Sequence, residues 1–313
     1  MTKLTAPSTN TEELELERGA LPQGTKNWPR ITLVTAVRNG ARYLEDTIRS
    51  IVDQGYPNLE YIVVDGVSTD GTLEIIRKYE TQLSWWVSQP DGGVYEALNT
   101  GFARSSGEIL GWLNASDILH PNSLFVLGSV FAAFPEVEWL TGRPTVLNAQ
   151  SMTVQVQRLP RWSRSRFLAG ANQHIQQEST FLRRSLWERA GGCVDAGYRD
   201  VGDFELWVRL FRHAPLYSLD TLIGGYRMHS DALSWGNIER YNQRCDAIIG
   251  RELASMRGGS FPKLFRWIGR VVKPIPKVRG LWQRIAINAL YRLPGPDWPP
   301  VIADLGNGWE IRR

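Results

Sequence analysis

The sequence predicts an α/β fold built on a mostly parallel sheet with helices on both faces. Short β-rich runs alternate with segments of helical periodicity over roughly the first 135 residues, and short connections join them. Such alternation is typical of βαβ units, in which a crossover helix joins two parallel strands. Polar loops follow several of the strand-like runs. In sheets of this kind ligands bind outside the carboxyl ends of the strands, so these loops are candidate ligand contacts.

Residues 31–37 are the first predicted strand, because this run is apolar and β-rich. Arg38-Asn39-Gly40 ends the strand. The run Gly55-Tyr56-Pro57 ends the helix that follows, and residues 59–64 form the second predicted strand, which stops at Asp65. The helix between them is indicated by apolar residues at helical spacing on one face: Leu44, Ile48, Ile51 and Val52.

The same alternation continues to Pro121, which suits the first turn of a further helix. Residues 83–88 and 109–113 are the third and fourth predicted strands, and Asn114 follows the fourth. Before the third strand, Ser68, Thr69 and Asp70 are N-cap candidates for a helix carrying Leu73 and Ile76. Between the third and fourth strands a helical stripe is expected, made of Val94, Ala97, Leu98, Gly101 and Phe102.

After about residue 140 the alternation weakens. Residues 141–158 are predicted to be extended, 179–184 a short strand and 185–190 a short helix. Asp203 opens another predicted helix, and residues 222–228 form a last short strand. Trp112 and Trp207 fall in apolar patterns and are predicted core residues, whereas Trp85 and Trp86 are left open between core and sugar-stacking roles.

Length and composition set the organisation. The 313 residues allow one large domain with appendages, or two domains. We expect a flexible, solvated arm over residues 1–27, a main domain over 28–240 with halves 28–135 and 136–240, and a helical C-terminal extension over 241–313. The extension is basic between Arg257 and Arg292. Its apolar and basic residues within 261–292 fit an amphipathic helix on anionic lipid, or a helix packed on the main domain.

The cysteines and apolar runs predict a cytoplasmic protein. Peripheral contact with the inner face of the cytoplasmic membrane is compatible with this prediction. Cys193 and Cys245 have no metal-type spacing, and two cysteines are too few for a disulfide framework. No run approaches the roughly 18 apolar residues of a membrane-spanning helix. The N-terminus lacks the apolar core of a signal peptide. No recognition motif supports nucleic-acid binding.

Three carboxylates, Asp65, Asp91 and Asp117, each follow a strand-like run, so the topology predicts that they converge. The chain has neither a G-x-x-x-x-G-K-S/T phosphate loop nor a G-x-G-x-x-G sequence after its first strand, which excludes the P-loop and dinucleotide-binding classes. Carboxylates can accept hydrogen bonds from a base or ribose, hold a divalent cation against a diphosphate, or deprotonate a hydroxyl. Together these roles indicate group transfer from a nucleotide-activated donor.

Six segments, in order, resemble the motifs of family 2 glycosyltransferases. The resemblance covers residues 30 to 235 and implies the GT-A fold, with 28–135 as the nucleotide-binding half and 136–240 as the acceptor half. It is nearest in character to the bacterial enzymes that build capsule, exopolysaccharide and lipopolysaccharide O-chains. The segments are TAVRNG (35–40), VDGVSTDGT (64–72), PDGGVYEALNTG (90–101), LNASD (113–117), GDFELWVRL (202–210) and YRMH (226–229).

The resemblance also implies roles for single residues. Asp203 would be the base that activates the acceptor hydroxyl in an inverting reaction. Asp117, with His229 nearby, would hold Mg²⁺ or Mn²⁺ against the diphosphate of a nucleotide-sugar donor. Thr35, Asp65 and Asp91 would contact the base and ribose. The remaining donor-binding residues implied by the motifs are Val37, Arg38, Asn39, Asn99 and Asn114.

Several alternatives remain open from the sequence. Asp70 is expected to cap a helix, and Asp91 could simply form a turn with Gly92-Gly93. The segment Asn114-Ala115-Ser116-Asp117 has one carboxylate where many relatives have two or three, so a non-catalytic sugar-nucleotide or glycan-binding protein on this fold is a second hypothesis. A nucleotidyltransferase is a third, although the chain lacks the Gly-rich, Lys-containing N-terminal loop of that class. The absence of a Q-x-x-R-W motif and of a membrane span argues against a processive synthase, and the expected acceptor is a glycan or lipid-linked sugar.

Overall fold

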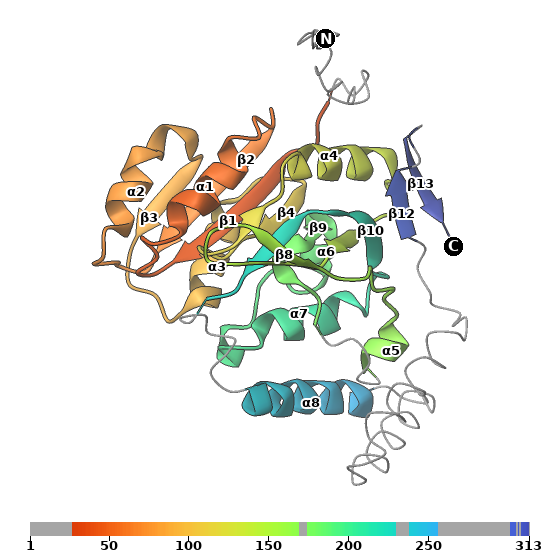
Figure 1. The fold of residues 1–313 in the computed structure, drawn as a ribbon. Coiled ribbons are helices and arrows are strands. Elements are labelled where there is room, and N and C mark those ends of the chain that lie inside the picture. The colour runs from red at the N-terminus through yellow and green to blue at the C-terminus, as the bar shows by residue number, and fades with distance from the viewer. Residues whose placement is uncertain are drawn as a thin grey trace, which may run out of the picture.

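The computed structural model describes residues 27–168, 174–229, 238–255, 301–304, 306 and 308–312. Its main sheet has nine strands in the order β13-β12-β10-β6-β9-β4-β1-β2-β3 (Figure 1). The strands are β1 (Ile31–Val37), β2 (Leu59–Asp65), β3 (Trp85–Ser88), β4 (Ile109–Trp112), β6 (Trp139–Arg143), β9 (Thr180–Arg183), β10 (Tyr217–Leu222), β12 (Val301–Asp304) and β13 (Trp309–Arg312).

Most neighbouring strands of this sheet are parallel, as the sequence predicts. β1 pairs in parallel with β2 and β4, and β2 pairs in parallel with β3. On the other side β10 is parallel to β6 and β12. β9 is antiparallel to both β4 and β6 and joins the two parallel parts, while β13 is antiparallel to β12.

A second, four-stranded sheet has the order β5-β11-β7-β8. Its strands are β5 (Ile118–Leu119), β11 (Gly224–Arg227), β7 (Thr145–Leu147) and β8 (Thr153–Val156). The extended region predicted over 141–158 therefore divides into β6, β7 and β8. The single strand predicted over 222–228 is corrected to two: β10 ends at Leu222 in the main sheet, and β11 begins at Gly224 in the second sheet.

Helices cover both faces of the main sheet, and each face has its own apolar core. One core contains buried residues of α1 (Leu44–Val52), α2 (Thr72–Lys78) and α4 (Ser123–Ala133). The other contains buried residues of α3 (Val94–Arg104), α5 (Arg164–Leu168), α6 (Arg184–Arg189), α7 (Gly202–Leu210) and α8 (Ile238–Ser255). Short 3₁₀ turns are η1 (Glu80–Gln82), η2 (Gln177–Ser179) and η3 (Ala196–Tyr198).

The C-terminal segment contributes to the main fold at both of its described ends. The predicted domain boundary at residue 240 falls inside α8, whose Cys245 and Ile249 are fully buried in the core that α7 also lines. β12 and β13 extend the main sheet beyond β10 (Figure 1). Residues 1–26 of the arm predicted over 1–27, and the predicted amphipathic segment 261–292, lie outside the described residues. Among the helices that are described, none combines the length and the apolar character needed to cross a bilayer.

Candidate active site

The carboxyl ends of β1, β2 and β3 lie side by side and hold the first loops of the site. The strand register pairs Val37 with Asp65, and Asp65 with Ser88. The Gly66 N–H donates to the Val37 carbonyl (2.8 Å), which joins the loops after β1 and β2. Asp65 is fully buried, and its Oδ2 accepts hydrogen bonds from the Ser88 hydroxyl (2.6 Å) and the Ser68 N–H (3.0 Å). Asp65 therefore fixes the strand-end loops from inside.

The turn after β1 is locked onto the loop after β2 by Asn39. Its backbone is left-handed (φ 53°), a conformation that asparagine tolerates better than most residues. The Asn39 N–H donates to the Ser68 hydroxyl (2.7 Å), and Asn39 Oδ1 accepts from the Thr69 N–H (2.9 Å). The N-cap position of α2 is Gly71, one residue after the predicted Asp70, but Asp70 accepts from the N–H of Thr72 (3.2 Å), the first residue of α2.

Asp91 faces the loop after β2. A Cβ added at Gly66 would lie 2.8 Å from Asp91 Oδ2 and 3.5 Å from the Arg38 Cβ, so only glycine allows this close approach. Asp91 Oδ1 accepts from the Gly93 N–H (2.9 Å), which is the turn contact expected of an Asp-Gly pair. Asp65 and Gly66 lie at the end of β2, and we name this pair the 65–66 corner. The structure thus brings Asp91 and Arg38 to this corner at the carboxyl edge of the sheet.

Two residues that were predicted to contact the nucleotide-sugar donor make hydrogen bonds within the protein instead. Thr35 is fully buried inside β1, and its hydroxyl accepts from the Tyr61 hydroxyl (3.1 Å), which argues against a donor contact. The Asn99 amide donates to the Val194 carbonyl (2.7 Å) and accepts from the Val194 N–H (2.8 Å). Both polar atoms of that side chain hold the loop before η3, so we assign Asn99 a structural role.

The tryptophans support the fold. Trp112 and Trp207 are buried and stacked with ring centroids 5.5 Å apart, which confirms their prediction as core residues. On the edge strand β3, Trp85 lies under the Arg104 guanidinium (5.2 Å). Trp86 donates its indole N–H to a carboxylate of η1. These contacts give both β3 tryptophans partners within the protein.

Asp117 ends the loop after β4 and is fully buried. Its Oδ1 accepts from the Arg227 N–H (2.9 Å) and its Oδ2 from the Asn114 amide (3.1 Å). The Thr47 hydroxyl of α1 donates to the Asp117 carbonyl (2.7 Å). Burial raises the pKa of Asp117 to about 6, although both side-chain hydrogen bonds lower it. The Asp117 carboxylate is therefore held in place, but its hydrogen bonds only partly offset the cost of burying its charge.

Arg227 connects this loop to the rest of the site, and the sequence analysis missed it. The side chain is fully buried, its Nε donates to the Ser116 carbonyl (2.6 Å), and its guanidinium lies 4.6 Å from the Tyr43 ring centroid. The His229 ring lies 5.0 Å from the same Tyr43 ring, which brings His229 to the side of the site that contains Asp117. Further contacts of the guanidinium are Ala149 O (3.2 Å), Ser151 Oγ (2.8 Å) and Asp46 Oδ2 (3.3 Å).

Asp203 lies at the start of α7 and is half-buried. Tyr95 of α3 donates its hydroxyl to Asp203 Oδ1 (3.2 Å) and accepts from the Asp203 N–H (3.3 Å). A Cβ at Gly202 would lie 2.7 Å from the Tyr95 ring, so glycine permits α7 to begin against tyrosine. Burial raises the pKa of Asp203, while hydrogen bonds from the Phe204 N–H and the Tyr95 hydroxyl lower it.

Glu178, in η2, is a second residue that the sequence analysis missed. It is buried, and burial followed by the negative charges of Asp117 and Asp203 raises its pKa well above the usual range. Asp117 and Asp203 therefore lie within electrostatic reach of one carboxyl group. A Cβ at Gly224 would lie 2.1 Å from the Glu178 carbonyl, so β11 packs directly on this turn. One feature of the sequence could have drawn attention to Glu178: it is the first acidic residue after residues 139–177, which contain no Asp or Glu.

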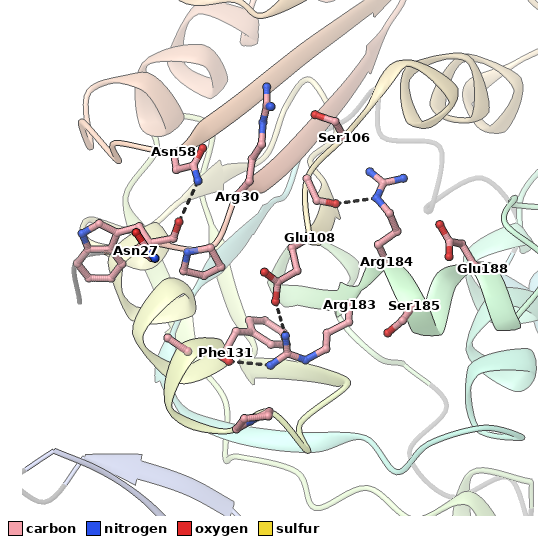
Figure 2. Close-up of a pocket in the computed structure, with 15 residues that line it drawn as sticks. Asn27, Arg30, Asn58, Ser106, Glu108, Phe131, Arg183, Arg184, Ser185 and Glu188 are labelled. Atoms are coloured by element: carbon pink, nitrogen blue, oxygen red, sulfur yellow. Dashed lines mark hydrogen bonds and ion pairs between the residues drawn. The ribbon is translucent and has the colours of Figure 1, made fainter. Parts of the chain in front are cut away.

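An open hollow of about 910 Å³ lies at the opposite, amino-terminal edge of the parallel strands (Figure 2). Its three arginines, Arg30, Arg183 and Arg184, are engaged with the protein. Arg183 contacts Glu108 (2.6 Å) and the Phe131 carbonyl (2.7 Å), and Arg184 donates to the Gly107 carbonyl (2.7 Å). None of the predicted site residues lines this hollow. We therefore place the site at the carboxyl edge.

Residues 32–183 match the family described as Glycosyl transferase family 2. This match covers 152 of the 313 residues and makes the chain similar to family 2 glycosyltransferases. A glycosyltransferase of Rickettsia conorii, named as uncharacterized, is 24% identical over 225 residues, which are 70% of this chain and 37% of that protein. TuaG of Bacillus subtilis, whose name assigns it to teichuronic acid biosynthesis, is 34% identical over 95 residues, 29% of this chain and 38% of TuaG. The match thus spans well under half the length of either relative.

The fold of the chain is the GT-A type. The mannosyltransferase PcManGT from Pyrobaculum calidifontis, solved with GDP-Man and Mn²⁺, aligns with a TM-score of 0.59 and 20% identity over 87% of this chain and 78% of that chain. TarS from S. aureus, solved with UDP-GlcNAc, aligns with a TM-score of 0.56 and 16% identity over 76% of this chain and 70% of that chain. At these identities the similarity establishes the fold alone.

The residues present suit a divalent cation that is shared with a ligand. Within the described residues, no group of three or more His, Cys, Asp or Glu side chains is arranged to hold a metal ion. Asp117 nevertheless supplies a buried carboxylate whose charge is only partly compensated, near the second carboxyl group of Glu178. Mg²⁺ is often bound by one or two carboxylates together with phosphate oxygens and water. A donor diphosphate would complete such a coordination shell.

Proposed function

We propose that the chain transfers one sugar from a nucleotide-diphosphate donor to a hydroxyl of a glycan or lipid-linked acceptor, with inversion at the anomeric carbon. One observation carries this proposal: Tyr95, which follows the Asp91 turn at the start of α3, holds Asp203 by hydrogen bonds of 3.2 and 3.3 Å. Hydrogen bonds thus link Asp203, the proposed base, to the segment that contains Asp91, a proposed contact of the nucleotide-sugar donor. We propose that the donor lies between the 65–66 corner, Asp91 and Asp117.

In the proposed reaction Asp203 accepts the proton of the acceptor hydroxyl. The acceptor oxygen forms a bond to the anomeric carbon while the bond from that carbon to the diphosphate oxygen breaks on the opposite face. The proton ends on the Asp203 carboxylate, and the electron pair leaves with the nucleotide diphosphate. Because burial raises the pKa of Asp203, its carboxylate is a stronger base than an exposed aspartate, which favours general-base catalysis near neutral pH.

Asp117 would hold a divalent cation, with His229 near it, and the cation would neutralise charge on the departing diphosphate. PcManGT was solved with GDP-Man and Mn²⁺, and TarS with UDP-GlcNAc, which supports a nucleotide-sugar donor for this fold. The two donors differ in both base and sugar, so we propose the donor class and leave the nucleotide to experiment. The name of TuaG supports a role in the synthesis of a surface polysaccharide, which we place at the cytoplasmic face of the membrane.

The test is a donor screen with purified protein. UDP-, GDP- and dTDP-sugars are incubated with Mn²⁺ or with EDTA, and release of nucleotide diphosphate is measured by chromatography. We expect one donor class to be consumed faster with Mn²⁺, and the transferred sugar to show the opposite anomeric configuration by NMR. Retention of configuration would overturn the inverting mechanism. Pyrophosphate release from a nucleoside triphosphate and a sugar phosphate would instead support a nucleotidyltransferase.

A non-catalytic sugar-nucleotide-binding protein is the second candidate, and the single carboxylate of residues 114–117 favours it. Calorimetric titration of nucleotide diphosphates with and without Mn²⁺ separates the two candidates. Metal-linked binding together with donor turnover supports the transferase. Donor binding without turnover against any acceptor supports the binding protein.

A further inference from the structure

Exposed apolar side chains gather on and beside β8. Met152, Val154 and Val156 are 59%, 57% and 52% exposed, and Met228 is 43% exposed. Met228 lies next to this strand pair, because its N–H donates to the carbonyl of Leu147 in β7 (2.9 Å). We name these four residues the β8 surface. In the described part of the chain, Val67 is the remaining large hydrophobic residue with comparable exposure. Single exposed apolar residues are ordinary, whereas a cluster of them marks an interaction site.

β8 is an edge strand without the usual protection. It is the outer strand of the second sheet, and every residue of it is exposed. Residues 151–157 contain no charge and no proline. By contrast, the edge strand β13 carries Glu310 and Arg312, and the edge strand β3 is covered at Trp85 by Arg104. Natural proteins usually blunt exposed edges with charge, proline or cover, so β8 is open to a partner.

The charge around β8 argues for an anionic partner. Residues 139–177 contain five arginines and no Asp or Glu: Arg143, Arg158, Arg161, Arg164 and Arg166. Arg143 forms an ion pair with Asp220 (2.5 Å) and Arg164 with Glu252 (2.8 Å). Arg158 is exposed directly after β8. Asp46, which contacts the β7–β8 turn at Ser151, is itself paired with Arg227. A second copy of the chain would bring the same basic segment to the contact.

The side chains of the β8 surface select among anionic partners. Nucleic acid and anionic glycans present charge but little apolar surface for Met152, Val154 and Val156 to bury. An anionic bilayer offers both, since its headgroups attract arginine and the acyl boundary accepts apolar side chains. We propose that the β8 surface, together with Arg158, docks the protein on an anionic membrane.

The docking surface is attached directly to the proposed site. Arg227 binds the β7–β8 turn at Ala149 and Ser151, and its backbone N–H holds Asp117. Met228 lies between Arg227 and His229 in the sequence. Docking would therefore present the Asp117 side of the site to the bilayer, where a lipid-linked acceptor would lie. This consequence rests on the proposed function, whereas membrane binding itself does not.

Sedimentation of the full-length protein with vesicles tests the proposal. We expect binding to phosphatidylcholine vesicles that contain phosphatidylglycerol, and little binding to phosphatidylcholine alone. The triple variant M152S/V154S/V156S should bind at least tenfold more weakly, and Arg158→Glu about tenfold more weakly. Val67→Ser and Arg312→Glu are matched controls on other parts of the surface and should bind like the wild type.

The outcomes separate docking from catalysis. Nucleotide diphosphate release from a soluble donor should be the same in the β8 variants and in the wild type, because none of the changed residues belongs to the proposed site. Unchanged vesicle binding by the triple variant, or equal binding to neutral and anionic vesicles, would overturn the docking proposal. Failure of the donor screen with intact vesicle binding would overturn the proposed function alone. Circular dichroism of the variants confirms that they are folded.

Discussion

The hydrogen bond between Tyr95 and Asp203 gives a direct prediction about pH dependence. Tyr95→Phe removes one hydroxyl and leaves the ring against Gly202. That hydroxyl donates to Asp203 Oδ1 (3.2 Å), so it stabilises the ionised carboxylate and lowers the pKa of Asp203. Without it the pKa rises, and a higher pH is needed to ionise the proposed base. The acid limb of kcat/KM should therefore move to higher pH.

The size of the shift follows from the strength of one charge-assisted hydrogen bond. Such a bond contributes about 1.5–3 kcal/mol, and a distance of 3.2 Å places this one near the lower end. One pKa unit corresponds to about 1.4 kcal/mol. We therefore expect the limb to move by about one pH unit, with activity on the alkaline side of the limb close to that of the wild type.

The assay is the pH profile of kcat/KM for the donor and acceptor found in the screen, since this profile reports ionisations of the free enzyme. Tyr56→Phe is the matched control. Its hydroxyl also makes a hydrogen bond, to the Pro29 carbonyl (2.8 Å), but at the amino-terminal edge of β1. The control should lose stability without moving the limb. An unmoved limb in Tyr95→Phe, or a shift toward lower pH, would show that the Tyr95 hydroxyl does not lower the pKa of the catalytic base.

Three further changes test the rest of the site. Arg227→Lys should weaken Mn²⁺-dependent donor binding about 10- to 100-fold in calorimetry, because lysine cannot make the forked contacts that position the Asp117 loop; wild-type affinity would contradict this role. Asp117→Asn should abolish the gain in donor affinity caused by Mn²⁺ and leave binding in EDTA unchanged, and a retained metal effect would remove Asp117 as the metal ligand. Gly224→Ala should lower the free energy of unfolding by about 3 kcal/mol and the Tm by about 6–12 °C, because its Cβ would lie 2.1 Å from the Glu178 carbonyl. Gly250→Ala, with open space at its Cβ, is the control and should keep or raise the Tm, and equal losses in the two variants would contradict the packing argument.

The sequence predicted the first half of the fold well because local patterns determine it. The apolar runs of β1, β2 and β4 and the helical stripes of α1 and α3 recur at fixed spacings. The second half depends on pairing between distant segments. β12 pairs with β10 across about eighty residues, and no local pattern marks that contact. The expected helical C-terminal extension consequently missed two strands, and the strand expected over 222–228 was not divided between two sheets.

In the candidate site, too, the features set by local sequence could be predicted, whereas those set by contacts between distant residues could not. The approach of Asp91 to Gly66, the residue after Asp65, follows from the parallel strands, whose carboxyl ends share one edge of the sheet. Thr35 lies two residues before the end of β1 and is fully buried, which its position in the motif alone did not reveal. Tyr95, Glu178 and Arg227 act through buried contacts with residues far away in the sequence. Such contacts are visible only when the chain is folded.

The most direct test of the proposed reaction is Asp203→Asn, measured for both donor binding and transfer. Asparagine keeps the shape of the side chain and can keep a contact with the Tyr95 hydroxyl, but it cannot accept the acceptor proton. We expect calorimetric donor affinity with Mn²⁺ to stay within about threefold of the wild type while transfer falls at least about 100-fold, within the range for a lost general base. Transfer at the wild-type rate with unchanged donor affinity would contradict the assignment of Asp203 as the base.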